Sequence, residues 1–235
     1  MEKDSVSKRI VELDAARGIA ILCVVAMHVF SFGKAFGGWD PAWIPFFYAV
    51  KQYGGSFFVL LSGVCVTLGS KSVKRGAVVF LCGMVFTGLT AWLYFSGQEG
   101  ETVLIQWGVL HCIGACMMLW PLFKKLPPAA RIVIGAVIVI AGYYLQLQIH
   151  VRNPWLFPLG LRTWDFTAFD YFPLMPHLGW FLLGSGIGSF VYKDRRPLFP
   201  SLKPGVLAFC GRQSLAIYII HQPLLYLIFR FGGRP

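Results

Sequence analysis

Two histidines inside apolar stretches are the residues of this sequence best suited to do chemistry. His28 ends a run that starts with charged residues at Glu12 and then becomes almost entirely apolar, and His221 lies in a second apolar run near the C-terminus. Imidazole titrates near neutral pH, so it can take a proton from a hydroxyl or an amine as a general base. An ionisable side chain within a stretch long enough to cross a bilayer is a candidate for function. We therefore treat His28 and His221 as candidate catalytic residues.

Each of these histidines follows an arginine at a helical distance. Arg17 precedes His28 by eleven residues, which is about three turns and about 16 Å of helix. Arg212 precedes His221 by nine residues, which is about 13 Å if a single straight helix joins them. Guanidinium groups bind phosphates through paired hydrogen bonds, so both arginines could hold a nucleotide-like donor. The alternative is that these cations only set the membrane topology.

Two long outer loops, at about 33–53 and 149–171, carry residues that could bind an acceptor. Both loops combine aromatic and charged side chains, and the second is too polar to span a membrane. For the aromatic residues, the alternatives are a platform for a sugar ring and an ordinary belt at the membrane–water interface. The candidate acceptor-binding residues in these loops and at the start of the following span are Trp39, Asp165, Asp170 and His177.

The composition indicates a polytopic membrane protein. Of the 235 residues 57% are hydrophobic and 13% are charged, whereas about 25% of a soluble protein is charged, and the mean hydropathy is +0.65. The net charge of +11 comes from short basic runs between apolar spans, so no nucleic-acid partner is expected. The six cysteines all lie in apolar stretches without a Cys-x-x-Cys pair, which predicts reduced thiols. No two histidines have the spacing of a metal site on one helix, so we expect no metal.

The apolar stretches predict an all-α fold, a bundle of about seven transmembrane helices that forms a single domain over residues 1–235. The predicted spans are about 16–34, 54–70, 76–96, 103–123, 129–148, 172–192 and 206–230. With the N-terminus inside, fifteen of the 21 lysines and arginines lie in inner segments and six in outer ones. The positive-inside rule then places the N-terminus inside and the C-terminus outside, with His28 in the outer half of the membrane.

Four short stretches of the sequence are distinctive in combination, namely Glu12–Ala20 with His28, Gly108–Gly114, Asp170–Gly184 and Gly211–Pro223. Together they resemble the heparan-alpha-glucosaminide N-acetyltransferase-like family of small prokaryotic membrane proteins. The resemblance implies transfer of an acetyl group from cytoplasmic acetyl-coenzyme A to a sugar or amino-sugar hydroxyl or amine on the outer side, a glycan modification. It also implies that His28 is the catalytic base, with His221 beside it. The coenzyme's phosphates would be bound by Arg17, Arg212, Lys74 and Arg75.

Two other functions stay open on the sequence alone. A transporter or flippase for a lipid-linked sugar would use the same aromatic loops and basic inner edge, but no acidic residue is central to a span and no inverted repeat is visible. A structural membrane subunit would use its histidines only to tie helices together. The resemblance implies an integral protein of a prokaryotic cytoplasmic membrane, and the sequence is also compatible with a homodimer.

Overall fold

The protein is all-helical in the computed structural model, as the sequence predicts. The structure describes residues 10–39 and 45–232, and within these ranges the side chains other than those of 45–52 and Thr102. No strand forms in these ranges, where only two isolated bridges occur. The helices are α1 (Val11–Gly37), α2 (Pro45–Leu68), α3 (Ser72–Phe95), η2 (Glu101–Val103), α4 (Val109–Phe123), α5 (Pro128–Gln148), η3 (Pro154–Leu159), α6 (Leu174–Val191), α7 (Val206–Arg212) and α8 (Ser214–Gly232).

Five helices are long and apolar enough to cross a membrane, namely α1, α3, α5, α6 and α8. Two further apolar helices, Tyr53–Leu68 and α4, are shorter. Since a helix needs about 20 residues to cross the hydrocarbon core, the five long helices identify an integral membrane protein. The count of seven spans and the sides on which the termini lie stay predictions.

Two of the predicted spans differ from the helices that form. The span at 103–123 becomes α-helical only at Val109, because side chains cap the chain there and the residues before it are extended or 3-10 helical. The span at 206–230 is interrupted at Gln213, whose φ of −96° and ψ of 11° separate α7 from α8. The estimate of about 13 Å along one straight helix from Arg212 to His221 is therefore wrong.

The first predicted loop is also shorter than 33–53. Helix α1 continues to Gly37, where Gly38 ends it in a left-handed conformation with φ 66°, and α2 begins at Pro45. The second loop, 149–171, contains no α-helix and only the short η3. One aromatic residue of the first predicted loop and three basic residues of the N-terminal inner segment lie outside the described residues, namely Trp43, Lys3, Lys8 and Arg9.

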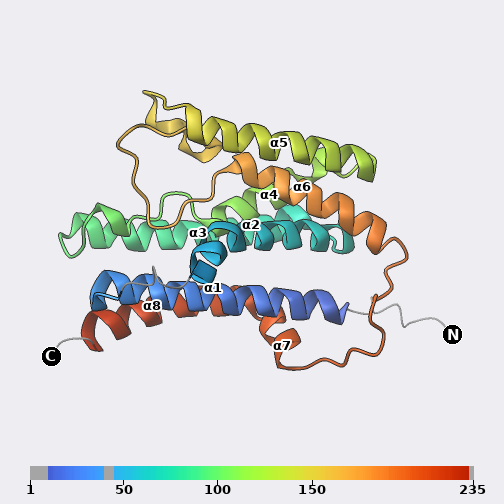
Figure 1. Ribbon diagram of the computed structural model, residues 1–235, viewed down its shortest axis with the longest axis horizontal. Coiled ribbons are helices and arrows are strands. Elements are labelled where there is room, and N and C mark those ends of the chain that lie inside the picture. Colours follow the sequence, from blue (N-terminus) through green and yellow to red (C-terminus); the bar gives the residue numbers. More distant parts are fainter. Residues whose placement is uncertain (1–9, 40–44, 233–235) are drawn as a thin grey trace. The chain divides into compact units, whose positions relative to one another are not determined.

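The chain divides into two compact units, Met1–Gly54 with Tyr192–Pro235, and Gly55–Val191. In the first unit, α8 and α7 both pack on α1, and Figure 1 shows α1 in blue beside α8 in red. A Cβ atom on Gly18 would collide with the carbonyl group of Leu207, and one on Gly211 would collide with that of Asp14. Helices α1 and α7 therefore cross with their backbones in contact, which only glycine permits.

Close glycine contacts between helices also occur in the second unit. Helices α5 and α6 lie side by side, and α3 runs along α4 (Figure 1). Gly135 of α5 faces Gly179 of α6, and Gly76 of α3 faces Gly114 of α4, each with backbone atoms at the position of the missing Cβ. The prediction of a single domain over 1–235 stays a prediction.

Candidate active site

Helices α1 and α8 bring His28 and His221 into direct contact, although the two residues are 193 positions apart. Nδ1 of His28 lies 2.7 Å from Nε2 of His221. The two rings are stacked, with centroids 4.9 Å apart and planes 21° from parallel. His221 exposes only 6% of its surface. The two candidate catalytic residues thus belong to one cluster, in which His221 is buried and His28 is half-buried.

The hydrogen bonds of His221 decide which nitrogen of each ring carries hydrogen. Nδ1 of His221 lies 3.0 Å from the carbonyl oxygen of Ile217. A carbonyl oxygen only accepts, so Nδ1 carries the hydrogen and, in the neutral ring, Nε2 carries the lone pair. That lone pair accepts from Nδ1 of His28, which leaves the lone pair of neutral His28 on its Nε2. We therefore assign His28 Nε2 as the nitrogen of the pair that takes a proton.

Two buried polar residues of α8 complete the cluster, and sequence analysis missed both. Tyr218 exposes 6% and Gln222 exposes 5% of its surface. The Tyr218 ring meets His28 and His221 edge-on, with centroid distances of 6.2 Å and 5.3 Å. Nε2 of Gln222 donates to the Tyr218 hydroxyl at 3.4 Å. The sequence signal was the spacing from His221. Tyr218 lies three residues before it, which places both on one helix face, and Gln222 directly follows it.

Arg17 and Arg212 flank the crossing of α1 and α7. Arg17 directly precedes Gly18, and Arg212 directly follows Gly211, the two glycines at which the helices touch. Arg17 pairs with Asp14 at 3.3 Å and keeps 28% of its side chain exposed. Arg212 is exposed, with its guanidinium carbon 6.0 Å from the centre of the Phe209 ring. Since α1 is unbroken from Arg17 to His28, about 16 Å of helix separates this crossing from the histidine pair.

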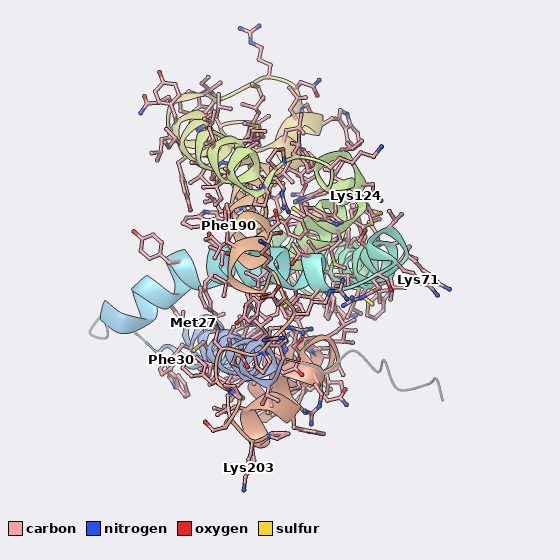
Figure 2. All side chains as sticks on the ribbon, turned by 90° about the vertical axis from the view of Figure 1, so that its right-hand side faces the viewer. Met27, Phe30, Lys71, Lys124, Phe190 and Lys203 are labelled. Atoms are coloured by element: carbon pink, nitrogen blue, oxygen red, sulfur yellow. The ribbon has the colours of Figure 1, made fainter. Side chains whose placement is uncertain are left out.

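The other predicted phosphate contacts, Lys74 and Arg75, lie in the second unit. Both are exposed in the first turn of α3. Figure 2 shows Lys71, which directly precedes this helix, with its side chain extended away from the ribbon. The start of α3 is therefore a basic, solvent-facing turn, and a role of Lys74 and Arg75 in binding the donor stays a prediction.

The predicted acceptor residue of the first unit, Trp39, packs back onto α1. Its ring occupies the space that a side chain on Gly33 would fill, and its backbone N–H donates to the Gly33 carbonyl oxygen at 3.1 Å. The ring also meets Phe229 of α8 edge-on at 5.5 Å while 46% of the residue remains exposed. Trp39 therefore joins the ends of α1 and α8, and its contact with an acceptor stays a prediction.

In the second unit, Asp170 caps the start of α4. Its Oδ2 accepts from the backbone N–H of Val109 at 3.1 Å, and Nδ1 of His111 accepts from the N–H of Gly108 at 3.2 Å. His111 Nε2 lies 3.2 Å from the hydroxyl of Thr87. Both His111 nitrogens therefore have structural partners, and two N–H groups at this helix end are satisfied.

The remaining predicted acceptor residues differ in exposure. His177 is buried, and its Nδ1 donates to the carbonyl oxygen of Pro173 at 2.8 Å. Asp165 is exposed, next to Trp164, which stacks on His150 with ring centroids 3.8 Å apart. Their contact with an acceptor stays a prediction.

The loop at 149–171 is held together by its own polar contacts. The Tyr171 hydroxyl donates to the carbonyl oxygen of Phe157 at 2.6 Å. Burial raises the pKa of the Tyr171 phenol, although the nearby Arg162 guanidinium opposes this shift. The phenol therefore stays protonated and keeps its hydrogen bond. Backbone N–H of Val151 adds a bond to the Arg162 carbonyl oxygen at 2.9 Å, so the loop has a defined conformation.

The parts of the chain that the structure describes contain no candidate metal-binding group and no disulfide. No group of three or more histidine, cysteine, aspartate or glutamate side chains is placed to hold a metal there. No disulfide joins any of the six cysteines, all of which lie in the described ranges.

Of the comparisons with known proteins, the one with family models gave a match. Searches of curated proteins and of solved structures gave no match. A family model described as heparan-alpha-glucosaminide N-acetyltransferase, catalytic, matches residues 9–223, which is most of the chain and includes both histidines, Tyr218, Gln222 and both arginines. The chain therefore belongs to the heparan-alpha-glucosaminide N-acetyltransferase catalytic family, a family of membrane acyltransferases.

Proposed function

We propose that the protein transfers an acetyl group from acetyl-coenzyme A to a hydroxyl or amine of a sugar-like acceptor. The family match supports the reaction class. The observation that carries the proposal is the 2.7 Å contact between His28 Nδ1 and His221 Nε2, because it leaves His28 Nε2 as the proton-accepting nitrogen. The donor is taken from the cytoplasmic side and the acceptor from the outer side.

In the proposed reaction His28 acts as general base. Its Nε2 removes a proton from the acceptor O–H or N–H while the acceptor oxygen or nitrogen attacks the thioester carbonyl carbon. The electron pair of the C=O double bond moves onto the oxygen and then returns as the C–S bond breaks. The leaving thiolate takes the proton from the His28 imidazolium, which yields the acetylated acceptor and coenzyme A. His221 accepts from His28 Nδ1 throughout and is a positioning residue.

Arg17 and Arg212 suit the phosphate end of the donor. They lie at one helix crossing, and Arg212 has no acidic partner among the described residues. The distance of about 16 Å along α1 to His28 matches a ligand that has its charges at one end and its reactive group at the other. Coenzyme A has this form, because an extended pantetheine arm separates its phosphates from its thiol.

The decisive experiment measures acetyl transfer by the protein in lipid nanodiscs. Acetyl-coenzyme A is supplied with a panel of sugars and amino sugars, and both free coenzyme A and the acetylated acceptor are quantified by mass spectrometry. We expect acceptor-dependent turnover, with His28→Asn lower by about 10²–10⁴-fold. His150→Asn, which changes a histidine outside the predicted spans, is the matched control.

Three outcomes would contradict the proposal. Absence of transfer to every acceptor would remove the assigned reaction. Full activity in folded His28→Asn protein would remove the assigned base. Movement of a lipid-linked sugar across the bilayer without acetyl-coenzyme A would instead identify a flippase.

A further inference from the structure

The chain between α6 and α7, residues 192–205, plays no part in the proposed reaction and is called the linker below. It contains no helix. The helices that it leads from and toward, α6 and α8, are both long and apolar enough to cross a membrane. Non-helical backbone is not tolerated in contact with the hydrocarbon core, because its polar groups would lack hydrogen bonds. The linker therefore lies at a membrane surface.

The linker carries an excess of positive charge. It has four cations, Lys193, Arg195, Arg196 and Lys203, and one acidic residue, Asp194. All four cations are exposed, and none forms an ion pair within the described residues. Figure 2 shows the Lys203 side chain extended away from the ribbon. These charges are therefore available to an anion outside the protein.

Three large apolar side chains of the linker are exposed between these cations. Leu198 exposes 54%, Phe199 exposes 60% and Leu202 exposes 42% of its surface. Exposure of such side chains to water is unfavourable. At a bilayer surface the same side chains can enter the boundary between headgroups and acyl chains while neighbouring cations meet anionic headgroups. The mixture of residues thus suits a lipid surface better than water.

The connection between α4 and α5 gives a contrast within the same protein. It also carries an exposed pair of adjacent cations, Lys124 and Lys125. Its one leucine, Leu126, is half-buried. Positive charge at the end of a span is common, whereas exposed apolar residues between the cations are particular to the linker in this comparison.

The linker is held in place on the first unit. The backbone N–H of Leu198 donates to a carboxylate oxygen of Glu12 at 2.6 Å, which attaches the middle of the linker to the first turn of α1. The backbone N–H of Arg195 donates to the carbonyl oxygen of Tyr192 at 3.0 Å and closes a turn. The cations and apolar side chains therefore extend from a backbone of defined conformation.

We propose that the linker is a binding surface for anionic phospholipids. Its cations bind headgroup phosphates, for which arginine has a matching pair of donors, and its three exposed apolar side chains enter the headgroup–acyl boundary. The orientation predicted from the sequence puts the linker on the cytoplasmic side, where anionic lipids make the surface potential negative. The inference does not depend on the proposed acetyl transfer.

Lipid titration followed by native mass spectrometry tests this surface. Phosphatidylglycerol or phosphatidylcholine is added to the detergent-solubilised protein, and we expect tighter binding of phosphatidylglycerol. Arg195→Gln/Arg196→Gln should weaken phosphatidylglycerol binding by about 10–30-fold, since each cation near an anionic surface contributes about fivefold. Lys124→Gln/Lys125→Gln is the matched control and should keep the wild-type affinity. Phe199→Ser should weaken the binding of both lipids.

Amide hydrogen exchange of the wild-type protein gives a second readout that needs no variant. We expect the amides of 192–205 to exchange more slowly in nanodiscs of phosphatidylglycerol than in nanodiscs of phosphatidylcholine. The loop at 149–171 serves as the internal reference and should exchange equally in both. Equal exchange of the linker in the two lipids would overturn the inference even if the variants failed to fold.

Two further outcomes would also overturn it. An equal loss of phosphatidylglycerol affinity in the two double variants would show that positive charge attracts the lipid without a localised surface. Weaker coenzyme A binding in Arg195→Gln/Arg196→Gln, with unchanged phosphatidylglycerol affinity, would assign the linker to the donor instead. None of these measurements requires turnover, so failure of the proposed function would be recognised separately.

Discussion

His28 Nδ1 donates to His221 Nε2 across 2.7 Å, and His221 Nδ1 donates in turn to the carbonyl oxygen of Ile217 at 3.0 Å. The backbone of α8 therefore orients His28 on α1 through a single intermediate side chain. The arrangement places a dedicated positioning group behind a proton acceptor, which is the logic of other base-assisted acyl-transfer sites.

The first prediction separates the roles of the two histidines. His221→Asn removes the ring that accepts from His28, so the His28 tautomer and orientation are no longer fixed. We expect kcat to fall by at least about tenfold, with an unchanged KM for acetyl-coenzyme A and a smaller loss than in His28→Asn. Steady-state kinetics on nanodisc protein would test this, and a loss in His221→Asn greater than that in His28→Asn would exchange the assigned roles.

The second prediction concerns the donor's phosphates. Arg17→Ala or Arg212→Ala should weaken coenzyme A binding by about 1–3 kcal/mol, the usual cost of losing a charged hydrogen bond. Lys34→Ala, which removes a cation at the other end of α1, is the matched control. Isothermal titration calorimetry measures the affinity. Equal affinities for Arg17→Ala, Arg212→Ala and Lys34→Ala would show that these arginines only set the topology.

The third prediction concerns the glycine crossing of α1 and α7. Gly18→Ala places a methyl group on the Leu207 carbonyl and must push the helices apart, which should destabilise the protein by about 1–3 kcal/mol. The control is Gly88→Ala in α3, where the added Cβ meets no atom of the surrounding structure within 4 Å. This variant should leave the stability unchanged or slightly higher. Thermal unfolding of the two variants in the same detergent measures the difference. Equal midpoints would refute the close contact.

The fourth prediction distinguishes capping from acceptor binding. Asp170→Ala leaves the Val109 N–H without its carboxylate partner and should destabilise the protein by about 1 kcal/mol, as for loss of a helix cap. The exposed Asp165→Ala is expected to leave the unfolding midpoint unchanged. If Asp165 binds the acceptor, its variant raises only the KM for the acceptor. An Asp170→Ala protein of wild-type stability would contradict the capping role.

The sequence predicts the histidine pair because both residues interrupt long apolar stretches, where an ionisable group is conspicuous. Tyr218 and Gln222 are harder to find, because a tyrosine in an apolar helix is common and its neighbours on α1 follow only from the packing. The capping role of Asp170 depends on Val109, which lies 61 residues away in sequence. No local pattern indicates such a contact.

The positions of the helices, like the site residues, could be predicted only in part from the sequence. The apolar stretches predict where most helices lie, because burial in lipid requires a continuous helical backbone. The break between α7 and α8 was not predicted, since Gln213 is neither proline nor glycine and apolar residues continue on both sides of the short polar run Arg212–Ser214. The start of α4 at Val109 was also missed, because its caps come from Asp170 and from the His111 ring.

The single non-helical residue at Gln213 has a mechanical consequence. Helix α7 is held against α1 by the close contacts of Gly18 and Gly211, whereas α8, which carries His221, begins directly after Gln213. Any tilting of α8 would pivot at that joint. Such a motion would part the two imidazoles while the arginines beside these glycines stayed in place, so the reaction centre would be able to open without release of the charged end of a bound donor.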